Sequence, residues 1–284
     1  MLTIASRNLK IFFRDRSAVF FSLLAVFIII GLYVLFLGDT LQSSMSELKG
    51  VRFLMDSWIM AGLLAVTSVT TTMGAFGIMV DDRAKKNFKD FYASPLKRSD
   101  IAGGYILSSF LIGLIMTVIS FILAEIYILT SGGELLPFIS LLKVLGLILI
   151  SVLSSSAMIF FMVSFFKSTN AFATASTIVG TLIGFLTGIY IPIGSLPDAV
   201  QLVVKIFPVS HAGVLFRQVF MEKPLQETFE GIPTEKLADF KDELGVVFHY
   251  GDFTAGTGTH LLVLIITTLV FFGLAVWNIS RKSS

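Results

Sequence analysis

The sequence contains no cysteine, which excludes disulfide bonds, thiolate nucleophiles and cysteine-based metal sites. Charged residues are also scarce, at 14% of the 284 residues, whereas a soluble domain carries about a quarter to keep its surface hydrated. Only three histidines occur, and their scatter predicts surface side chains and not a metal-binding trio: His211, His249 and His260. These deficits argue against a soluble globular protein.

Several functional motifs are missing as well. No G-x-x-x-x-G-K-[ST] phosphate loop is present, so the chain does not bind ATP in the P-loop manner. The G-x-S-x-G and H-E-x-x-H patterns are absent too. The serines of 151–156 have no neighbouring residue that could act as a base, so they do not predict a nucleophile. Small hydroxyl side chains in such an apolar stretch favour close helix packing. We therefore expect no catalytic residue, no metal ion and no cofactor on this chain itself.

Long uncharged apolar runs dominate what is present. Hydrophobic residues make up 55% of the chain, with 28 phenylalanines, and the mean hydropathy is +0.88. A helix needs about 20 apolar residues to cross about 30 Å of hydrocarbon. Six runs are long enough, namely 18–37, 57–80, 105–129, 144–166, 171–191 and 261–279. They predict an all-α polytopic membrane protein with six transmembrane helices in a single domain, 1–284.

The basic residues indicate the orientation. They gather before the first run, between the second and third runs, and at the C-terminal end, whereas 222–252 is rich in acids. By the positive-inside rule, we expect both termini in the cytoplasm. The membrane that we expect is a bacterial plasma membrane. The first apolar run is too long for the core of a cleavable signal peptide, so we expect it to be retained.

The first 16 residues predict an amphipathic helix. Leu2, Ala5, Leu9 and Phe12 recur on one face, and basic residues occupy the other. This pattern is typical of a helix that lies in the membrane interface.

The connection 81–100 predicts a docking site for a partner protein. Two acids open it, where a helix start favours negative charge, and Pro95 ends the helix. Aromatic side chains among so many charges indicate docking, either onto a partner protein, which we favour, or onto lipid headgroups. The residues that we expect to make this contact are Asp82, Arg83, Lys86, Phe88, Phe91, Tyr92 and Pro95.

The connection 192–260 is the longest, and we expect it outside the cell. Its first part is too apolar for an open loop, and Pro192, Pro197 and Pro208 divide it into two short helices. Such helices predict re-entrant segments packed against protein. The second part, 222–252, is acidic and predicts a small external excursion.

Two features within the runs have alternative interpretations. Thr67, Thr70 and Thr71 belong to a polar stripe of the second run that either lines a translocation path or packs a helix pair. Glu125 is the only ionisable residue in the six runs. It either takes part in a proton or cation path or lies at the membrane interface, near the end of the third helix.

The runs lack the charges and the two similar halves that are typical of secondary transporters, which points to an external motor. The layout resembles the ABC-2-type permease family over essentially the whole chain. The resemblance depends on the amphipathic first helix, the six runs, the charged 81–100 loop and the stretch from Pro192-Ile-Gly-Ser-Leu-Pro197 to Pro208-Val-Ser-His211. The loop departs from the family's acidic-Gly-Thr pattern at Lys86-Asn87-Phe88.

The resemblance implies that 81–100 is a coupling helix seated in a separate ATPase subunit, which binds ATP and magnesium. Two such ATPase chains would act with two permease chains, in a homodimer or a related heterodimer. The path between the permeases would be lined by the second and fifth runs, including Phe185. The expected cargo is an antimicrobial peptide, a drug, a lipid or a lipid-linked glycan, so the function would include multidrug or antimicrobial resistance. Nucleic acid is not an expected partner.

Two other function classes remain alternatives. One is an ion-coupled secondary transporter that uses Glu125. The other is a membrane-embedded enzyme or assembly scaffold, which the lack of clustered ionisable residues disfavours.

Overall fold

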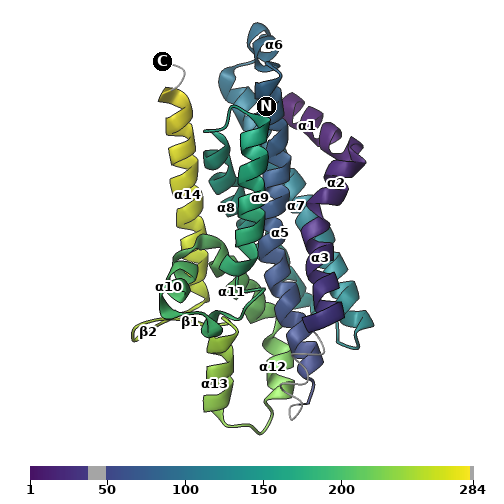
Figure 1. Ribbon diagram of the computed structural model, residues 1–284, viewed down its shortest axis with the longest axis vertical. Helices are drawn as coiled ribbons and strands as arrows, with labels where there is room; N and C mark the ends of the chain where they lie inside the picture. The colour runs from purple at the N-terminus through teal and green to yellow at the C-terminus, as the bar shows by residue number, and fades with distance from the viewer. Residues whose placement is uncertain (38–48, 282–284) are drawn as a thin grey trace.

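The computed structural model describes residues 1–37 and 49–281. Six helical segments within these ranges are long and apolar enough to cross a membrane, which confirms the six predicted runs (Figure 1). The first combines α2, α3 and a π-helical turn, η1 (Arg16–Ser22, Leu24–Leu32 and Tyr33–Leu37). The others are α5 (Val51–Ala84), α7 (Arg98–Thr130), α8 (Phe138–Val163), α9 (Thr169–Leu186) and α14 (Thr257–Arg281).

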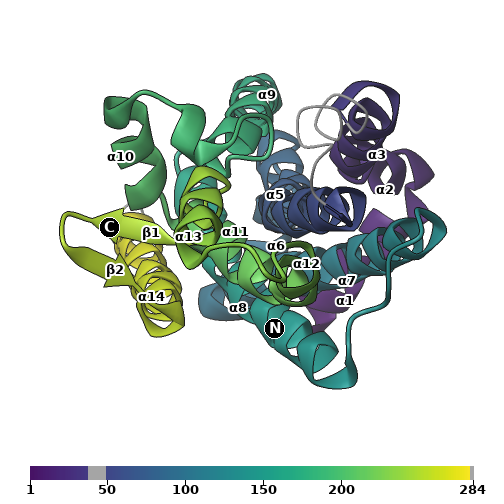
Figure 2. The ribbon, with the colours of Figure 1, turned by 90° about the horizontal axis from the view of Figure 1, so that it is seen from below.

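Helix α5 is the central element of the bundle. In its most apolar window 78% of residues are buried, against 11% for α9 and 22% for α14. Seen along the long axis, α5 lies between α3 on one side and α14 on the other (Figure 2). At 34 residues it is about 51 Å long, so it extends well beyond about 30 Å of hydrocarbon. The predicted run 57–80 corresponds to its apolar middle.

Small residues allow the central helices to approach closely. A Cβ atom on Gly113 of α7 would lie 2.7 Å from the Thr72 Oγ1 of α5 and 3.0 Å from a Val152 methyl of α8. Nearby, the Ser68 and Ser155 hydroxyls are hydrogen bonded at 3.2 Å. Three helices therefore meet at one point because glycine and small hydroxyl residues occupy it.

The N-terminal helix, α1 (Leu2–Arg14), is amphipathic as predicted. Its inner face buries Ile4, Ala5 and Phe12 against the first part of α7. A Cβ on Gly104 would lie 2.5 Å from the Ile4 Cβ, so only glycine permits this contact. The Asp15 side chain then accepts a hydrogen bond from the Ala18 N–H at 3.0 Å, which caps α2 and redirects the chain.

The connection between α9 and α14 contains the predicted pair of short helices. They are α10 (Asp198–Ile206) and α11 (Pro208–Phe220), preceded by a 3-10 turn, η2 (Ile193–Ser195). The pair bends by 87°, and α11 packs against α5 with nearly all of its residues buried. This arrangement confirms the predicted pair of short helices packed against protein; whether the pair is re-entrant stays a prediction.

The acidic excursion contains more structure than the sequence indicated. Together with the residues that follow it directly, it folds into α12 (Glu222–Thr228), α13 (Thr234–Glu243) and an antiparallel hairpin of β1 (Phe248–Tyr250) and β2 (Phe253–Ala255). The hairpin was not predicted. Gly251, with φ of 60°, supplies the left-handed residue that its tight turn requires.

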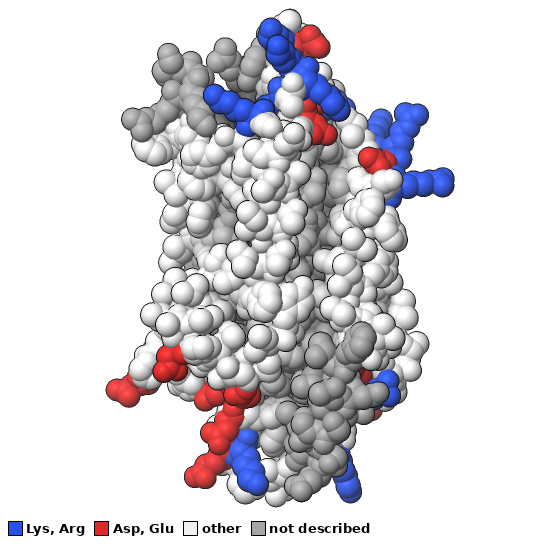
Figure 3. All heavy atoms as spheres, in the orientation of Figure 1, with Lys and Arg blue, Asp and Glu red and all other residues white. Residues whose placement is uncertain are grey.

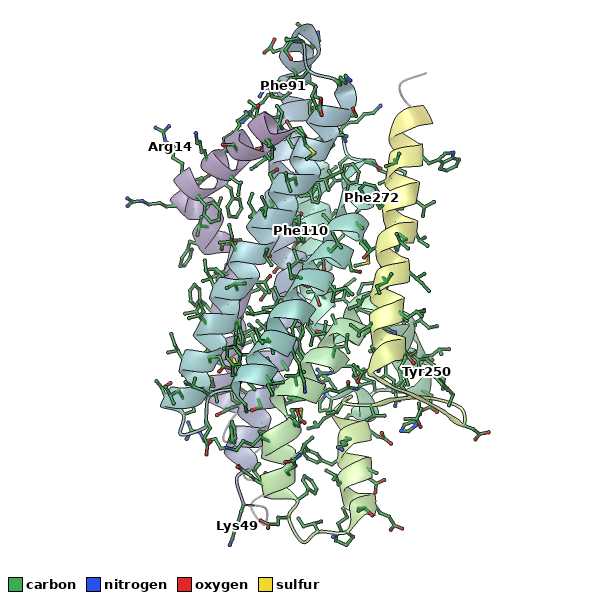
Figure 4. The ribbon with its side chains drawn as sticks, turned by 180° about the vertical axis from the view of Figure 1, so that it is seen from behind. Arg14, Lys49, Phe91, Phe110, Tyr250 and Phe272 are labelled. Atoms are coloured by element: carbon green, nitrogen blue, oxygen red, sulfur yellow. The ribbon has the colours of Figure 1, made fainter. Side chains whose placement is uncertain are left out.

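The two ends of the molecule differ in charge (Figure 3). Lysine and arginine gather around α1 and the turn after α5, which we call the basic end, and acids gather around α12 and α13, the acidic end. Figure 4 shows Arg14 and Phe91 at the basic end and Lys49 at the opposite end. The N-terminus and the last turn of α14 also lie at the basic end (Figure 1).

Candidate functional site

The candidate site is the tip of the basic end, where the chain passes from α5 to α7. Helix α5 continues to Ala84, a left-handed Lys86 (φ 64°) reverses the chain, and the short helix α6 (Phe88–Ala93) follows. The prediction that a helix begins at Asp81 and Asp82 is therefore wrong. These acids form the last turn of α5, a position that the helix dipole disfavours unless cations or donors compensate them.

Asp82 receives that compensation from several partners. Its two carboxylate oxygens accept from the Arg7 guanidinium at 2.7 and 3.0 Å. The Tyr105 hydroxyl donates at 2.5 Å and the Asn87 amide at 2.7 Å. Asp82 is 4% exposed, so in this conformation it holds α1, α5, α6 and α7 together and does not present its charge to a partner. Its bond to Asp82 raises the pKa of Arg7 above its ordinary value, so this side chain stays charged.

The two phenylalanines of α6 are half-buried, so only part of each ring is available for the partner contact that the sequence predicts. Phe88 stacks on Tyr105 with ring centroids 5.6 Å apart, and the Arg7 guanidinium lies 5.2 Å from the centre of the Phe91 ring. Contact with the chain's own residues therefore explains why aromatics occur in a charged loop. Their role is to fix the orientation of α6 against the bundle.

Arg83 connects the same tip to α8. Its guanidinium donates to the Val163 and Phe166 carbonyls at 3.1 and 3.4 Å, where α8 ends and its carbonyls lack helical partners. It also lies 5.8 Å from the centre of the Phe88 ring. The tip is thus attached to three long helices and to α1.

The outer surface of the tip is strongly charged. Its exposed side chains include Lys85, Lys86, Lys89, Asp90 and Pro95. Of the residues predicted to dock, Lys86 and Pro95 are therefore accessible. Three more are partly covered, namely Arg83, Phe88 and Phe91, and Asp82 is buried. Tyr92 belongs to α6, and its side chain lies outside the described part of the chain.

The residues predicted to line a substrate path do not share one exposed surface. Thr67 and Thr71 are at most 1% exposed, and their hydroxyls donate to carbonyls one turn earlier in α5, at 2.8 and 2.7 Å. Their burial favours the packing interpretation for these two. Thr70 is half-buried, and Phe185 of α9 is 44% exposed, so a path beside those two stays a prediction.

Glu125 lies near the end of α7 that is distant from the tip. One of its carboxylate oxygens accepts from the Leu136 N–H at 3.1 Å, within the connection to α8. The side chain is half-buried and fastens this connection to α7. This contact favours the interpretation as a residue at the helix end.

The prediction of scattered surface histidines is wrong for two of the three. His211 of α11 and His260 of α14 are 2% and 0% exposed, and their Nδ1 atoms lie 2.8 Å apart. His249 is exposed and contacts Asp242 at 2.9 Å. The described residues contain no group of three or more metal-binding side chains.

Sequence reasoning missed the partner of Asp82 and the role of Arg217. The amphipathic pattern of α1 places Arg7 on the polar face, but nothing in the sequence links it to a residue 75 positions away. Arg217 is 0% exposed within the re-entrant α11. A basic residue in so apolar a stretch was the one available signal.

Comparison with known families is consistent with this architecture. The family model described as ABC-2 family transporter protein matches residues 39–277, which include α5, the tip, the re-entrant pair and most of α14. No curated protein matches the chain.

Proposed function

The chain belongs to the ABC-2 transporter family, and we propose that it is the permease subunit of an ATP-driven exporter. A separate ATPase subunit would bind ATP and magnesium and dock on the tip of the basic end. The observation that carries this proposal is the set of contacts around Asp82, because Arg7, Asn87 and Tyr105 all donate to it and so join the tip to α1, α5 and α7.

The mechanism follows from the connections of the tip. A force applied to Lys86 and Lys89 would act on α6. Phe88 connects α6 to α7 through Tyr105, and Arg83 connects it to α8 through its contacts with Phe88 and the Val163 carbonyl. Interfaces packed this closely move as units and do not deform continuously. Closure of an ATPase dimer would thus tilt α5, α7 and α8 together and alternate the access of a path through the membrane.

The proposed cycle uses a second permease chain. This chain would cover α9, most of which is exposed in a single chain. Exposed apolar residues along α9 include Ile178, Leu182 and Phe185. We place the substrate path between two such helices, beside Phe185 and Thr70. Its nearly uncharged lining suits an amphipathic or hydrophobic cargo, such as an antimicrobial peptide, a drug, a lipid or a lipid-linked glycan.

The orientation in the proposal is that of a bacterial plasma membrane protein with both termini in the cytoplasm. The basic end carries the N-terminus and the last turn of α14, and cationic residues favour the cytoplasmic side (Figure 3). The acidic end then faces outward.

Purification from native membranes tests the proposal. We expect a P-loop ATPase to co-purify with the full chain, and reconstituted vesicles to move an amphiphilic dye only with hydrolysable ATP. Transport that runs on a proton gradient without ATP, and stops in Glu125→Gln, would instead establish the ion-coupled alternative.

A further inference from the structure

A cavity of about 790 Å³ lies near the acidic end of the bundle, far from the tip. Its walls come from α8, α11, α12, α13 and α14. The volume falls within the range of about 300–1,000 Å³ that is usual for small-ligand pockets. Most of the lining is apolar, including Leu147, Ile150, Leu215, Val219, Leu225 and Leu261.

Three charged side chains also line the cavity: Lys143 of α8, Glu222 of α12 and Lys241 of α13. The Lys143 Nζ lies 3.7 Å from a Glu222 carboxylate oxygen, and both side chains are about half exposed. Such an exposed pair contributes little stability, so a ligand can separate it at small cost. Lys241 takes part in none of the salt bridges of the described residues.

Two of the cavity's uncharged polar side chains, Gln218 and Thr257, are already engaged within the protein. The Gln218 amide donates to the Val246 carbonyl at 3.2 Å, and its oxygen accepts from the Thr257 hydroxyl at 2.9 Å. Gln226 and the three ionic side chains therefore remain to recognise a polar headgroup.

The cavity lies beside surfaces that face lipid. Leu142 and Leu149, on either side of Lys143 in α8, are 52% and 47% exposed, and Leu262 at the start of α14 is 56% exposed. Lys143 stands less than two turns from the beginning of α8, which places its ammonium group near the membrane–water boundary. An apolar chain from the adjacent leaflet can thus reach the cavity while its headgroup stays at the surface.

We propose that this cavity binds one phospholipid of that leaflet with a phosphate and a primary ammonium in its headgroup. The acyl part occupies the apolar lining, and the phosphate pairs with Lys143 and Lys241. The ammonium group pairs with Glu222, which the phosphate displaces from Lys143. The cavity presents two cations and one anion. This set matches a headgroup with a phosphate and an ammonium group better than a headgroup that carries only negative charge.

Photo-crosslinking tests the site. The full chain is reconstituted in phosphatidylcholine nanodiscs with a diazirine-acyl phosphatidylethanolamine probe, and the labelled peptides are mapped by mass spectrometry. We expect label on peptides that contain 143–150 or 215–226. Unlabelled phosphatidylethanolamine should suppress this label more effectively than phosphatidylglycerol or phosphatidylcholine. Inorganic phosphate should not suppress it.

Gly146 offers a variant that fills the cavity. It lines the cavity, and a Cβ atom there meets no atom within 4 Å, so Gly146→Phe adds a ring without a backbone clash. We expect this variant to lose the label. The matched control is Gly273→Phe on α14, which has the same free space and does not line the cavity.

Charge variants test the headgroup assignment. Lys143→Gln and Lys241→Gln should each weaken competition by phosphatidylethanolamine by about fivefold, the effect of one lysine–phosphate contact near a membrane. Lys236→Gln, on the same helix as Lys241 but outside the lining, should change nothing. Glu222→Gln should make phosphatidylglycerol the better competitor.

The proposal is overturned if Gly146→Phe keeps the label with an unchanged thermal midpoint. It is also overturned if inorganic phosphate suppresses the label, or if phosphatidylglycerol outcompetes phosphatidylethanolamine on the unmodified chain. All these measurements are made without ATP or a partner subunit. Their outcome is therefore independent of whether the chain is an exporter permease.

Discussion

His211 and His260 are hydrogen bonded to each other through their Nδ1 atoms, 2.8 Å apart, inside the interface between α11 and α14. The His211 Nε2 lies 2.9 Å from the Lys205 carbonyl, which can only accept, so this nitrogen carries a proton. Two protonated Nδ1 atoms would repel each other, so at most one ring can be charged. The pair fastens the re-entrant segment to the last transmembrane helix.

The first prediction concerns this pair. His211→Phe and His260→Phe should each destabilise the chain, because each leaves the remaining imidazole buried without its partner. The double variant should lose less than the sum of the two, with a coupling of about 1 kcal/mol. Thermal unfolding in detergent measures this cycle, and strict additivity would show that the bond contributes nothing.

The second prediction concerns Arg217, which donates to the Thr187 and Gly188 carbonyls at 2.8 and 3.1 Å, where α9 ends. The described residues place no carboxylate within salt-bridge distance of it. The negative end of α9 and the Trp58 ring, 5.2 Å away, stabilise its charge instead.

Replacing Arg217 by Met should therefore cost about 3 kcal/mol or more, because several buried carbonyls lose their donor. Arg217→Lys should be intermediate, since lysine keeps the charge but not the planar fork. Expression level and thermal midpoint report the order. A Met variant as stable as the unmodified chain would contradict this account of the site.

The third prediction separates packing from substrate contact in α5. Thr71→Val should leave both stability and the range of transported amphiphiles unchanged, because the Thr71 hydroxyl contacts its own helix backbone. Gly113→Leu should lower the thermal midpoint sharply, because its side chain would collide with Thr72 and Val152. An altered substrate range in a fully stable Thr71→Val variant would restore this residue to the path.

The fourth prediction concerns the attachment of the tip. Asp82→Asn should weaken the contact with Arg7 by about 2 kcal/mol, the usual contribution of a charge-assisted hydrogen bond in partly buried surroundings. Amide hydrogen exchange within α6 (Phe88–Ala93) should then accelerate by about thirtyfold. Exchange within α14 serves as the internal control, and equal rates in α6 before and after the change would contradict the bracing role.

The sequence was sufficient to predict the elements that one local pattern determines, such as apolar length, proline position or helical period. Apolar run length predicted all six spans, and the prolines at 192, 197 and 208 predicted the division of the following segment into two short helices. The amphipathic period predicted α1. The helix boundaries were less accurate, because α5 and α7 extend past the hydrocarbon as polar helices whose ends hydropathy does not reveal.

The candidate site was harder to predict because it depends on contacts between distant residues. The aromatic residues of 81–100 suggested a docking surface, whereas Phe88 and Phe91 contact Tyr105 and Arg7 of the same chain. Similarly, His211 and His260 are 49 positions apart and meet only after the re-entrant segment folds onto α14. Neither hydropathy nor spacing contains this pairing information.

The central claim is that an ATPase docks on the tip of the basic end. Because the chain has no cysteine, Lys89→Cys introduces a unique site for a benzophenone crosslinker on the exposed face of α6. After illumination in native membranes, the account predicts capture of a protein that contains a G-x-x-x-x-G-K-[ST] loop. The control Lys236→Cys, on α13 at the acidic end, should capture none. A stable Lys89→Cys chain that captures no P-loop protein, or capture of the same protein from Lys236→Cys, would contradict the account.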